Sequence, residues 1–136
     1  MRMQGREYEI YEELEGVLRE LDEDERVDAI IVEGARDKQA LEEMGITKKE
    51  ILKCRSIPHD AFVEHLRGKQ CVVILTDYDR AGKNFNRKLT SRLEKEGLRV
   101  ERSYRERIGE ILGVAGFKTV ESLRSLRKRA IAWKVE

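Results

Sequence analysis

Hydrophobic residues recur along the chain in two spacings, which predict helices and strands in turn. Residues 6–24 carry apolar side chains three and four positions apart, a spacing typical of an amphipathic helix. These side chains are Ile10, Leu14, Val17, Leu18 and Leu21. Two short runs at 27–32 and 71–75 are rich in Val and Ile and end in polar residues. Such runs predict strands that are buried on both faces of a sheet.

The other segments predict further elements around these two strands. In segment 80–96 an apolar line at four-residue spacing, ending before Gly97, predicts a helix; its members are Ala81, Phe85, Leu89 and Leu93. Segment 51–55 has two interpretations, because Thr47 and Glu50 form a potential helix-capping box ahead of it. We favour a strand there on topological grounds. Further helices are predicted at 36–44, 58–67, 105–112 and 120–130, and a strand at 98–104.

Strands that alternate with helices predict an α/β fold built on a parallel sheet. We expect a Rossmann-like sheet of about four strands flanked by helices. The 136 residues contain no internal repeat or low-complexity linker, so one domain is expected. Its core would span 27–104, preceded by the acidic helix 6–24 and followed by a basic helical extension at 105–136. No apolar run approaches the roughly 20 residues that span a bilayer, so we expect no membrane partner.

Charge is segregated along the chain although the net charge is only +1. Residues 1–28 carry 4 basic and 11 acidic side chains, whereas residues 80–136 carry 16 basic and 7 acidic ones. A basic segment on a nearly neutral protein favours a surface that faces phosphates. Abundant Lys, Arg and Glu are also typical of a thermophile. Two cysteines without a secretion signal predict reduced thiols and a cytoplasmic protein.

Carboxylates follow both of the clearest predicted strands. Glu33 follows the first, and Asp77 and Asp79 follow the later one. Ligands of open α/β sheets bind beyond the carboxyl ends of the strands, so we expect these acids to share one crevice. Crowded carboxylates need a cation, and oxygen ligands select Mg²⁺ or Mn²⁺. Gly34 and Gly82 would leave room for close backbone approach, and the start of the helix at 80 offers amide donors to a phosphate. The alternative is that the acids only cap helices or form turns.

Two motifs resemble those of the Toprim domain. VEGARD covers 32–37 and TDYDRAG covers 76–82, and the pair is similar to the Glu-Gly and Asp-x-Asp motifs that this family carries after its first and third strands. The family includes topoisomerases, bacterial primases, nucleases, recombination-repair proteins and the ribonuclease that matures 5S ribosomal RNA. The form of the motifs is closest to the primase and maturase branch, and small stand-alone Toprim proteins are the nearest match in size.

The resemblance implies a role for each matching position. Glu33 would act as general acid or base or bind metal, Asp77 and Asp79 would bind Mg²⁺, and Asp37 would support the metal site. Arg80 matches an arginine that follows the second aspartate in several branches. Lys83 departs from the glutamate often found there, which leaves open whether one or two metals bind. Topoisomerase activity is not expected, because no separate domain supplies a strand-cleaving tyrosine.

These features together predict Mg²⁺-dependent phosphodiester chemistry on nucleic acid, with a nuclease acting on structured RNA as the leading interpretation. RNA is favoured over DNA as partner, within a ribonucleoprotein complex as a further option. The alternative is a non-catalytic RNA or ribonucleoprotein binder that uses the metal site to dock phosphate. The oligomeric state is not predicted. Phosphate contacts are expected from Gly34, Gly82, Arg80, Lys83 and Arg87, and from the tail residues Arg124, Arg127 and Lys128.

Two other interpretations concern residues outside the acidic motifs. Cys54, His59, His65 and Cys71 match no standard zinc spacing, and the cysteines are better interpreted as core residues. Trp133, in the basic tail, would either stack on a base or pack into the core.

Overall fold

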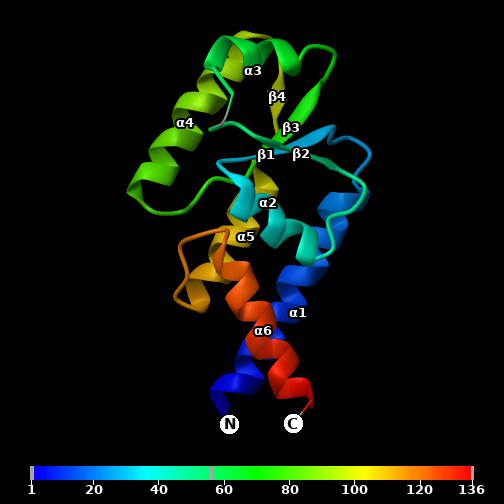
Figure 1. Cartoon of the computed structure of the whole chain (residues 1–136), viewed down its shortest axis with the longest axis vertical. Coiled ribbons are helices and arrows are strands. Elements are labelled where there is room, and N and C mark those ends of the chain that lie inside the picture. Colours follow the sequence, from blue (N-terminus) through cyan, green and yellow to red (C-terminus); the bar gives the residue numbers. More distant parts are fainter. Residues whose placement is uncertain (1, 56, 136) are drawn as a thin grey trace.

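The computed structural model describes residues 2–55 and 57–135, with side chains described for 6–55 and 57–133. Helices and strands alternate along the chain (Figure 1). The elements are α1 (Arg2–Glu23), β1 (Ala29–Val32), α2 (Ala35–Glu43), β2 (Glu50–Lys53), α3 (His59–His65), β3 (Cys71–Ile74), α4 (Arg80–Lys95), β4 (Arg99–Val100), α5 (Ser103–Val114) and α6 (Ser122–Val135).

The four strands form one parallel sheet in the order β2-β1-β3-β4. Ile30 of β1 lies opposite Ile51 of β2 and Val73 of β3, so β1 is central and fully buried. This arrangement confirms the predicted α/β fold with a four-stranded parallel sheet. It also places the carboxyl ends of all four strands at one edge.

Helices cover both faces of the sheet. On one face Ile31 and Ile74 pack against side chains of α3 and α4, among them Phe62 and Leu93. On the other face alternate strand residues pack against α1, α2, α5 and α6. Figure 1 shows α3 and α4 on one side of the sheet, with α1 and α6 extending from the other toward the two termini. The alternation of side chains along each strand thus gives two separate cores.

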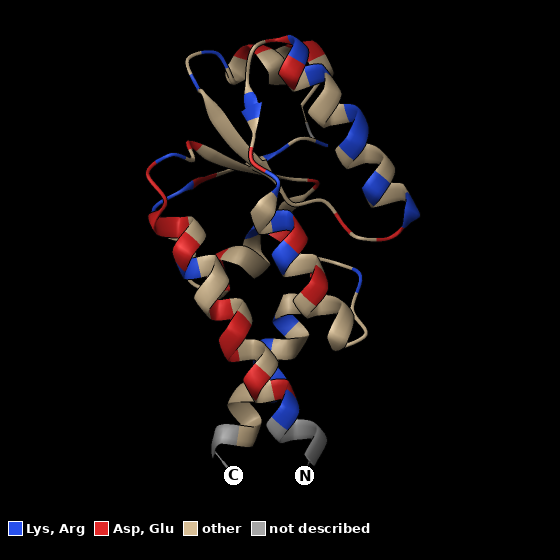
Figure 2. Cartoon of the chain, turned by 180° about the vertical axis from the view of Figure 1, so that it is seen from behind, with Lys and Arg blue, Asp and Glu red and all other residues tan. Residues whose placement is uncertain are grey.

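Helices α1 and α6 lie side by side and carry opposite charge (Figure 2). Arg129 of α6 lies 3.4 Å from a carboxylate oxygen of Glu7 on α1. The ring centroid of Trp133 lies 4.9 Å from that of Tyr8, so the half-buried Trp133 packs on α1. Part of the opposite charge of the two chain ends therefore forms contacts between α1 and α6.

Two predicted details are wrong for physical reasons. The strand predicted at 98–104 is only β4, because the carboxylate of Glu101 accepts hydrogen bonds from the backbone N–H and the hydroxyl of Ser103 and starts α5 there. In α4, Leu89 and Leu93 are buried, but Ala81 and Phe85 are exposed, Phe85 by 40%. The sheet explains this second difference. Its four-residue strands are about 13 Å long, whereas α4 is about 24 Å long, so its first turns extend past the sheet.

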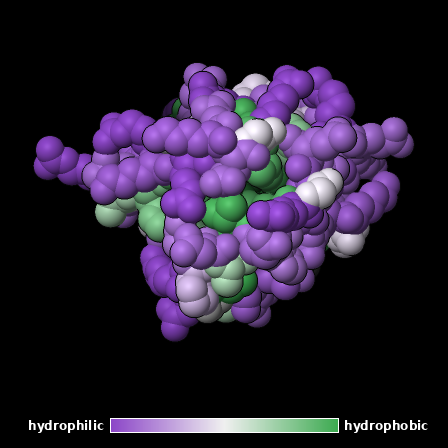
Figure 3. Space-filling model, turned by 90° about the horizontal axis from the view of Figure 1, so that it is seen from above, coloured by the Kyte–Doolittle hydropathy of each residue, from purple (hydrophilic) through white to green (hydrophobic). Residues whose placement is uncertain are grey.

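The segment at 51–55 is a strand, as predicted, over the range of β2. The capping box at Thr47 does not form, because its backbone N–H donates to Asp22 at the end of α1. Viewed from above, most of the surface side chains are hydrophilic, and hydrophobic residues show at the centre of this face and at its left and lower margins (Figure 3). No helix among residues 2–55 and 57–135 combines the length and apolar character that a bilayer crossing needs.

Candidate metal and nucleic-acid site

The structure brings the two acidic motifs together at the carboxyl edge of the sheet. Glu33 follows β1 directly, and its Oε1 accepts a hydrogen bond of 3.2 Å from the backbone N–H of Asp77, beyond β3. The neighbouring strands β1 and β3 run parallel, which fixes this meeting of residues 44 positions apart. Glu33 and Asp77 therefore lie next to each other, as the sequence leads us to expect.

Asp37 and Asp79 flank this pair from the first turns of two helices. Asp37 Oδ2 accepts a hydrogen bond of 3.1 Å from the N–H of Gly34 at the start of α2. Asp79 Oδ1 accepts one of 2.7 Å from the N–H of Gly82 and caps α4. Helix capping, the alternative role for such acids, thus holds for one oxygen of each aspartate. The other oxygen of each has no hydrogen-bond donor among the residues that the structure describes.

The carboxylates influence one another electrostatically. Burial, together with the negative charges of Glu33 and Asp79, raises the pKa of Asp77 above its ordinary value, against a backbone hydrogen bond that lowers it. Burial also raises the pKa of Asp37, and the charges of Asp77 and Glu33 add to this effect. A cation in the crevice would relieve the repulsion that both shifts report.

Arg55 is a neighbour of the site that the sequence did not reveal. Its guanidinium forms an ion pair with Glu33 Oε2, and its backbone N–H donates to the Glu33 carbonyl at 3.1 Å. Arg55 follows β2, so a third strand contributes to the site in addition to β1 and β3. Because β2 was itself ambiguous in the sequence, no local pattern placed Arg55 beside Glu33. Both carboxylate oxygens of Glu33 are therefore engaged by the protein.

Helix α5 holds the Asp-x-Asp loop from behind. The buried guanidinium of Arg105 donates to the carbonyl of Thr76 at 2.6 Å and to that of Asp77 at 3.0 Å. It also lies 4.4 Å from the ring centroid of Tyr78, whose hydroxyl donates to the Arg105 carbonyl at 2.8 Å. Burial lowers the pKa of Arg105 and raises that of Tyr78 to about 12. Tyr78 is thus a packed anchor of the loop.

The segment before α6 also contacts this loop. The N–H of Val120 donates to Asp77 Oδ1 at 2.9 Å, and the N–H of Tyr78 donates to the carbonyl of Lys118 at 2.6 Å. The C-terminal extension therefore contributes backbone groups to the geometry of the acids. Sequence patterns carry no signal for backbone contacts of this kind.

The sequence led us to expect that Gly82 leaves open space beside the acids, but the structure fills that space with backbone. A Cβ atom there would lie 2.1 Å from the carbonyl oxygen of Asp77, so the close approach is made by the protein's own loop. Gly34 differs, since a Cβ atom there would meet nothing within 4 Å. Open space beside the acids is therefore present at Gly34 and absent at Gly82.

The predicted phosphate-binding cations fall into two groups. Arg80, Lys83 and Arg87 are exposed on α4, which carries Lys and Arg along its length (Figure 2). The tail residues lie on α6 instead. There Arg124 pairs with Glu43 of α2 at 2.9 Å, and Arg127 interacts with Tyr11 of α1. Lys128 is exposed. The α4 group thus lies exposed on the helix that Asp79 caps, whereas two tail cations are turned toward neighbouring helices.

Among the described residues, no three His, Cys, Asp or Glu side chains form a ready-made metal cage. The candidate zinc residues do not cluster, and burial raises the pKa of the Cys54 thiol to about 11. The acids do fit a hard cation chemically. Asp37, Asp77 and Asp79 each keep one carboxylate oxygen without a donor among the described residues, and oxygen is the ligand type that Mg²⁺ prefers.

A family model described as the Toprim domain matches residues 28–104. This range holds both acidic motifs and covers more than half of the chain. The chain belongs to the Toprim domain family. Toprim domains typically bind Mg²⁺ through acidic residues and take part in metal-dependent functions on nucleic acid.

The relatives of this Toprim protein are small proteins of similar length. A UPF0292 protein of Pyrococcus horikoshii is 36% identical over 121 residues, which cover 89% of each chain. One from Thermococcus onnurineus is 34% identical over 130 residues, covering 96% of this chain and 92% of the relative. A solved structure of a protein from Aquifex aeolicus has a TM-score of 0.61 at 28% identity, covering 84% of this chain and 94% of the other.

Proposed function

We propose that this Toprim protein is a Mg²⁺-dependent phosphodiesterase that cleaves structured RNA. The observation that carries the proposal is the convergence of Glu33 and Asp77 across β1 and β3, flanked by Asp37 and Asp79. Four carboxylates that act on one another electrostatically, beside an exposed cationic helix, would repel a negatively charged substrate unless a divalent cation is also present.

Each residue has a distinct part in the proposed reaction. Asp77 and Asp79 would hold Mg²⁺ or Mn²⁺ with their second oxygens, and Asp37 would support the site. When bound, the metal would polarise the scissile phosphate and lower the pKa of a bound water. Glu33 would move a proton. Arg80 and Lys83, on the first turn of α4, would offset phosphate charge as the substrate enters.

Arg55 sets a condition on the role of Glu33. As long as the guanidinium occupies Oε2, that oxygen cannot accept a proton from the reacting water. Arg55 is well exposed on its side chain, by 73%, so its head group is free to exchange Glu33 for a phosphate oxygen when RNA binds. Substrate binding would thereby release the general base.

The engagement of Glu33 by Arg55 also favours a second candidate function. A Glu33 that stays paired leaves a site that binds metal and phosphate without catalysis. The protein would then act as an RNA or ribonucleoprotein binder that docks phosphate through Mg²⁺.

Metal binding is required by both functions and is tested first. Calorimetric titration with Mg²⁺ or Mn²⁺ should show a binding event that is at least tenfold weaker in the Asp77→Asn, Asp79→Asn double variant, because two anionic ligands become neutral. A Glu42→Gln, Glu43→Gln double variant on α2 removes the same charge away from the crevice and should titrate like the wild type. Equal affinity in all three proteins would refute the metal site.

A further inference from the structure

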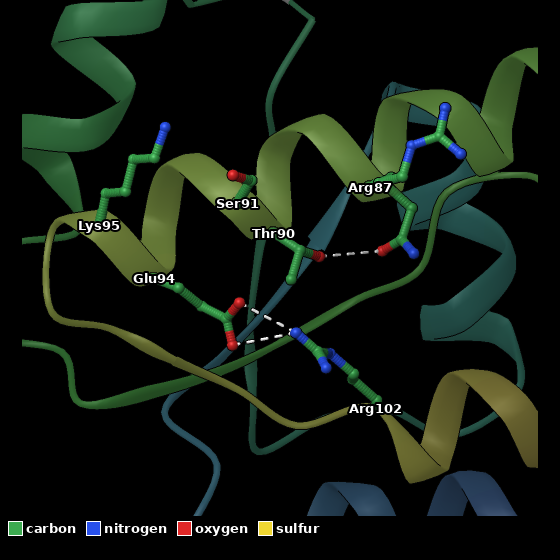
Figure 4. Close-up of a pocket in the computed structure, with 7 residues that line it drawn as sticks. Arg87, Thr90, Ser91, Glu94, Lys95 and Arg102 are labelled. Atoms are coloured by element: carbon green, nitrogen blue, oxygen red, sulfur yellow. Dashed lines mark hydrogen bonds and ion pairs between the residues drawn. The ribbon is translucent and has the colours of Figure 1, made fainter.

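Two adjoining cavities form a trough between α4 and α5. One has a volume of about 520 Å³ and begins at Tyr78, the neighbour of Asp77. The other, of about 640 Å³, ends at Lys95 in the last turn of α4 (Figure 4). Asn86 and Arg102 line both cavities, so the two adjoin, and the inner one begins at Tyr78 of the Asp-x-Asp loop.

Helix α5 faces α4 across the inner cavity, next to the first turns of α4 that extend past the sheet. Two glycines of α5, Gly109 and Gly113, line the inner cavity without side chains. A Cβ atom at Gly109 would lie 2.5 Å from the ring of Tyr78, whereas one at Gly113 would meet nothing within 4 Å. The inner end of the trough is therefore a slot lined by Tyr78, Gly113 and Phe117.

Cations line the trough next to this slot. Lys83 and Lys118 stand at the slot, and Arg87 and Lys95 stand along α4. None of these four has an ion pair among the described residues. Arg102 does, since it reaches from the start of α5 to Glu94 at 2.9 Å, and both residues line the outer cavity (Figure 4). Charge complementarity therefore selects an anionic occupant on the α4 side.

The α5 wall carries the opposite charge. Glu106 and Glu110 line the inner cavity from α5. They would repel phosphates from that wall and accept hydrogen bonds from amino groups. The occupant is thus expected to be anionic along one edge, and flat, aromatic and amino-bearing along the other. Nucleotides have this combination of properties.

We infer that the trough binds a single-stranded segment of nucleic acid that continues from the scissile phosphate. Its phosphates lie along α4, and one unpaired base enters the slot at Tyr78 and Phe117. Lys83 and Lys95 are twelve residues apart, about 18 Å along the helix. That length accommodates about five nucleotides at about 3.4 Å each. The strand must be unpaired there, because a paired base cannot present its face to an aromatic side chain.

This inference deepens the proposed function, on which it rests, by defining the substrate as RNA with a single-stranded arm next to the cleavage point. It is tested by binding alone. The probe is a fluorescein-labelled oligoadenylate of about eight nucleotides, measured by anisotropy at low salt with chelator present, so that neither metal nor cleavage is needed. A blunt RNA hairpin of equal charge serves as the second probe.

The decisive variant fills the slot without changing charge. Gly113→Leu should weaken oligoadenylate binding tenfold or more, since one stacked base is lost. The matched control is Gly16→Leu on α1, where a Cβ atom also meets nothing within 4 Å; it should bind like the wild type. A blunt hairpin should bind wild type at least tenfold more weakly than the oligoadenylate. Equal affinity of wild type and Gly113→Leu, or of the two probes, would overturn the inference.

A charge variant keeps the test valid if Gly113→Leu does not fold. Lys83→Gln with Lys118→Gln should lower the slope of log affinity against log salt by about 1.4, or about 0.7 for each lost phosphate contact. Lys88→Gln on the outer side of α4 should leave the slope unchanged, and an unchanged slope in the double variant would refute the trough. Oligoadenylate binding without any RNA cleavage would contradict only the proposed function, and cleavage without oligoadenylate binding would contradict only the trough.

Discussion

Asp22 joins the end of α1 to the segment that leads into β2. Its Oδ1 accepts hydrogen bonds from three successive backbone N–H groups, at 3.1 Å from Thr47, 2.9 Å from Lys48 and 3.1 Å from Lys49. Burial alone would raise the pKa of this carboxyl, but the three donors outweigh burial and lower the pKa below its ordinary value. The charged form is therefore the one that stabilises the fold.

Removing this carboxyl should destabilise the protein in a pH-dependent way. Asp22→Ala leaves three N–H groups without their acceptor and should lower the free energy of unfolding by about 2 kcal/mol at pH 7. Because the folded pKa is depressed, the stabilisation is complete above about pH 4, near the unfolded pKa, and is lost as pH falls through the folded value. Urea unfolding between pH 2.5 and 7 measures the difference.

The neighbouring Glu23 provides the control for Asp22. Its side chain is 57% exposed and lies 3.8 Å from Lys48, so Glu23→Ala should change the unfolding free energy by less than about 0.5 kcal/mol. A loss of unfolding free energy for Asp22→Ala that is the same at pH 2.5 and pH 7 would show that the charged carboxylate is not the stabilising form.

Arg105 is expected to position the Asp-x-Asp loop. Arg105→Gln removes a buried guanidinium that serves two carbonyl groups and should cost about 2 kcal/mol or more of unfolding free energy. It should also weaken Mg²⁺ binding, because the loop that carries Asp77 is released. Arg107→Gln, two residues along α5, removes a half-exposed arginine that pairs with Glu20 at 2.6 Å and should leave metal affinity unchanged. Calorimetry that shows the same Mg²⁺ affinity for both variants would remove the positioning role.

The acids of the site could be predicted from the sequence, whereas the residues that hold them could not. Glu33, Asp77 and Asp79 were predictable because each follows an apolar run that identifies its strand. Arg55 and Arg105 were not, because one depends on an ambiguous strand and the other on the packing of α5 behind β3. Long-range contacts between elements leave no spacing in the sequence, so the partners that hold the acids had no signal.

At the scale of elements, the two basic helices are expected to contribute unequally to nucleic-acid binding. Arg124 pairs with Glu43 and Arg127 interacts with Tyr11, so both would have to break a contact to bind RNA. The exposed Lys128 is therefore the tail cation expected to bind RNA most readily. Changing all three tail residues to Gln should lower the slope of log RNA affinity against log salt by no more than about 0.7. The same variant should lower the melting temperature. A reduction of 2 or more would show that α6 is a principal RNA surface.

The sequence predicted which elements form better than it predicted their lengths and buried faces, because neighbouring elements determine these. The alternating pattern at 98–104 allowed a long strand, yet the Glu101 carboxylate accepts hydrogen bonds from Ser103, the first residue of α5, and β4 has only two residues. The apolar line of α4 was read correctly for Leu89 and Leu93 and wrongly for Ala81 and Phe85. A periodic pattern reports that a helix has an apolar side, but the length of the sheet beneath it decides how much of that side is buried.

At the scale of the whole molecule, charge serves two separate purposes. The acidic α1 and the basic α6 pair with each other, whereas the cations of α4 stay exposed beside the acidic edge of the sheet (Figure 2). The sequence revealed the segregation of charge and not its division between folding and binding. Relatives from thermophilic archaea agree with a composition rich in charged residues, and thermophily of this protein stays a prediction.

The proposed reaction is RNA cleavage beside Asp77 and Asp79, with Glu33 as the proton-transfer group. The most direct measurement compares cleavage of a labelled structured RNA by wild type and Glu33→Gln, with Mg²⁺ or with chelator. Glu12→Gln on the exposed side of α1 is the control. We predict cleavage that requires Mg²⁺, falls by about 10²-fold or more in Glu33→Gln and is unchanged in Glu12→Gln, while RNA binding persists in all three proteins. Cleavage that survives intact in Glu33→Gln, or RNA that is bound and never cleaved by wild type, would contradict the proposed reaction.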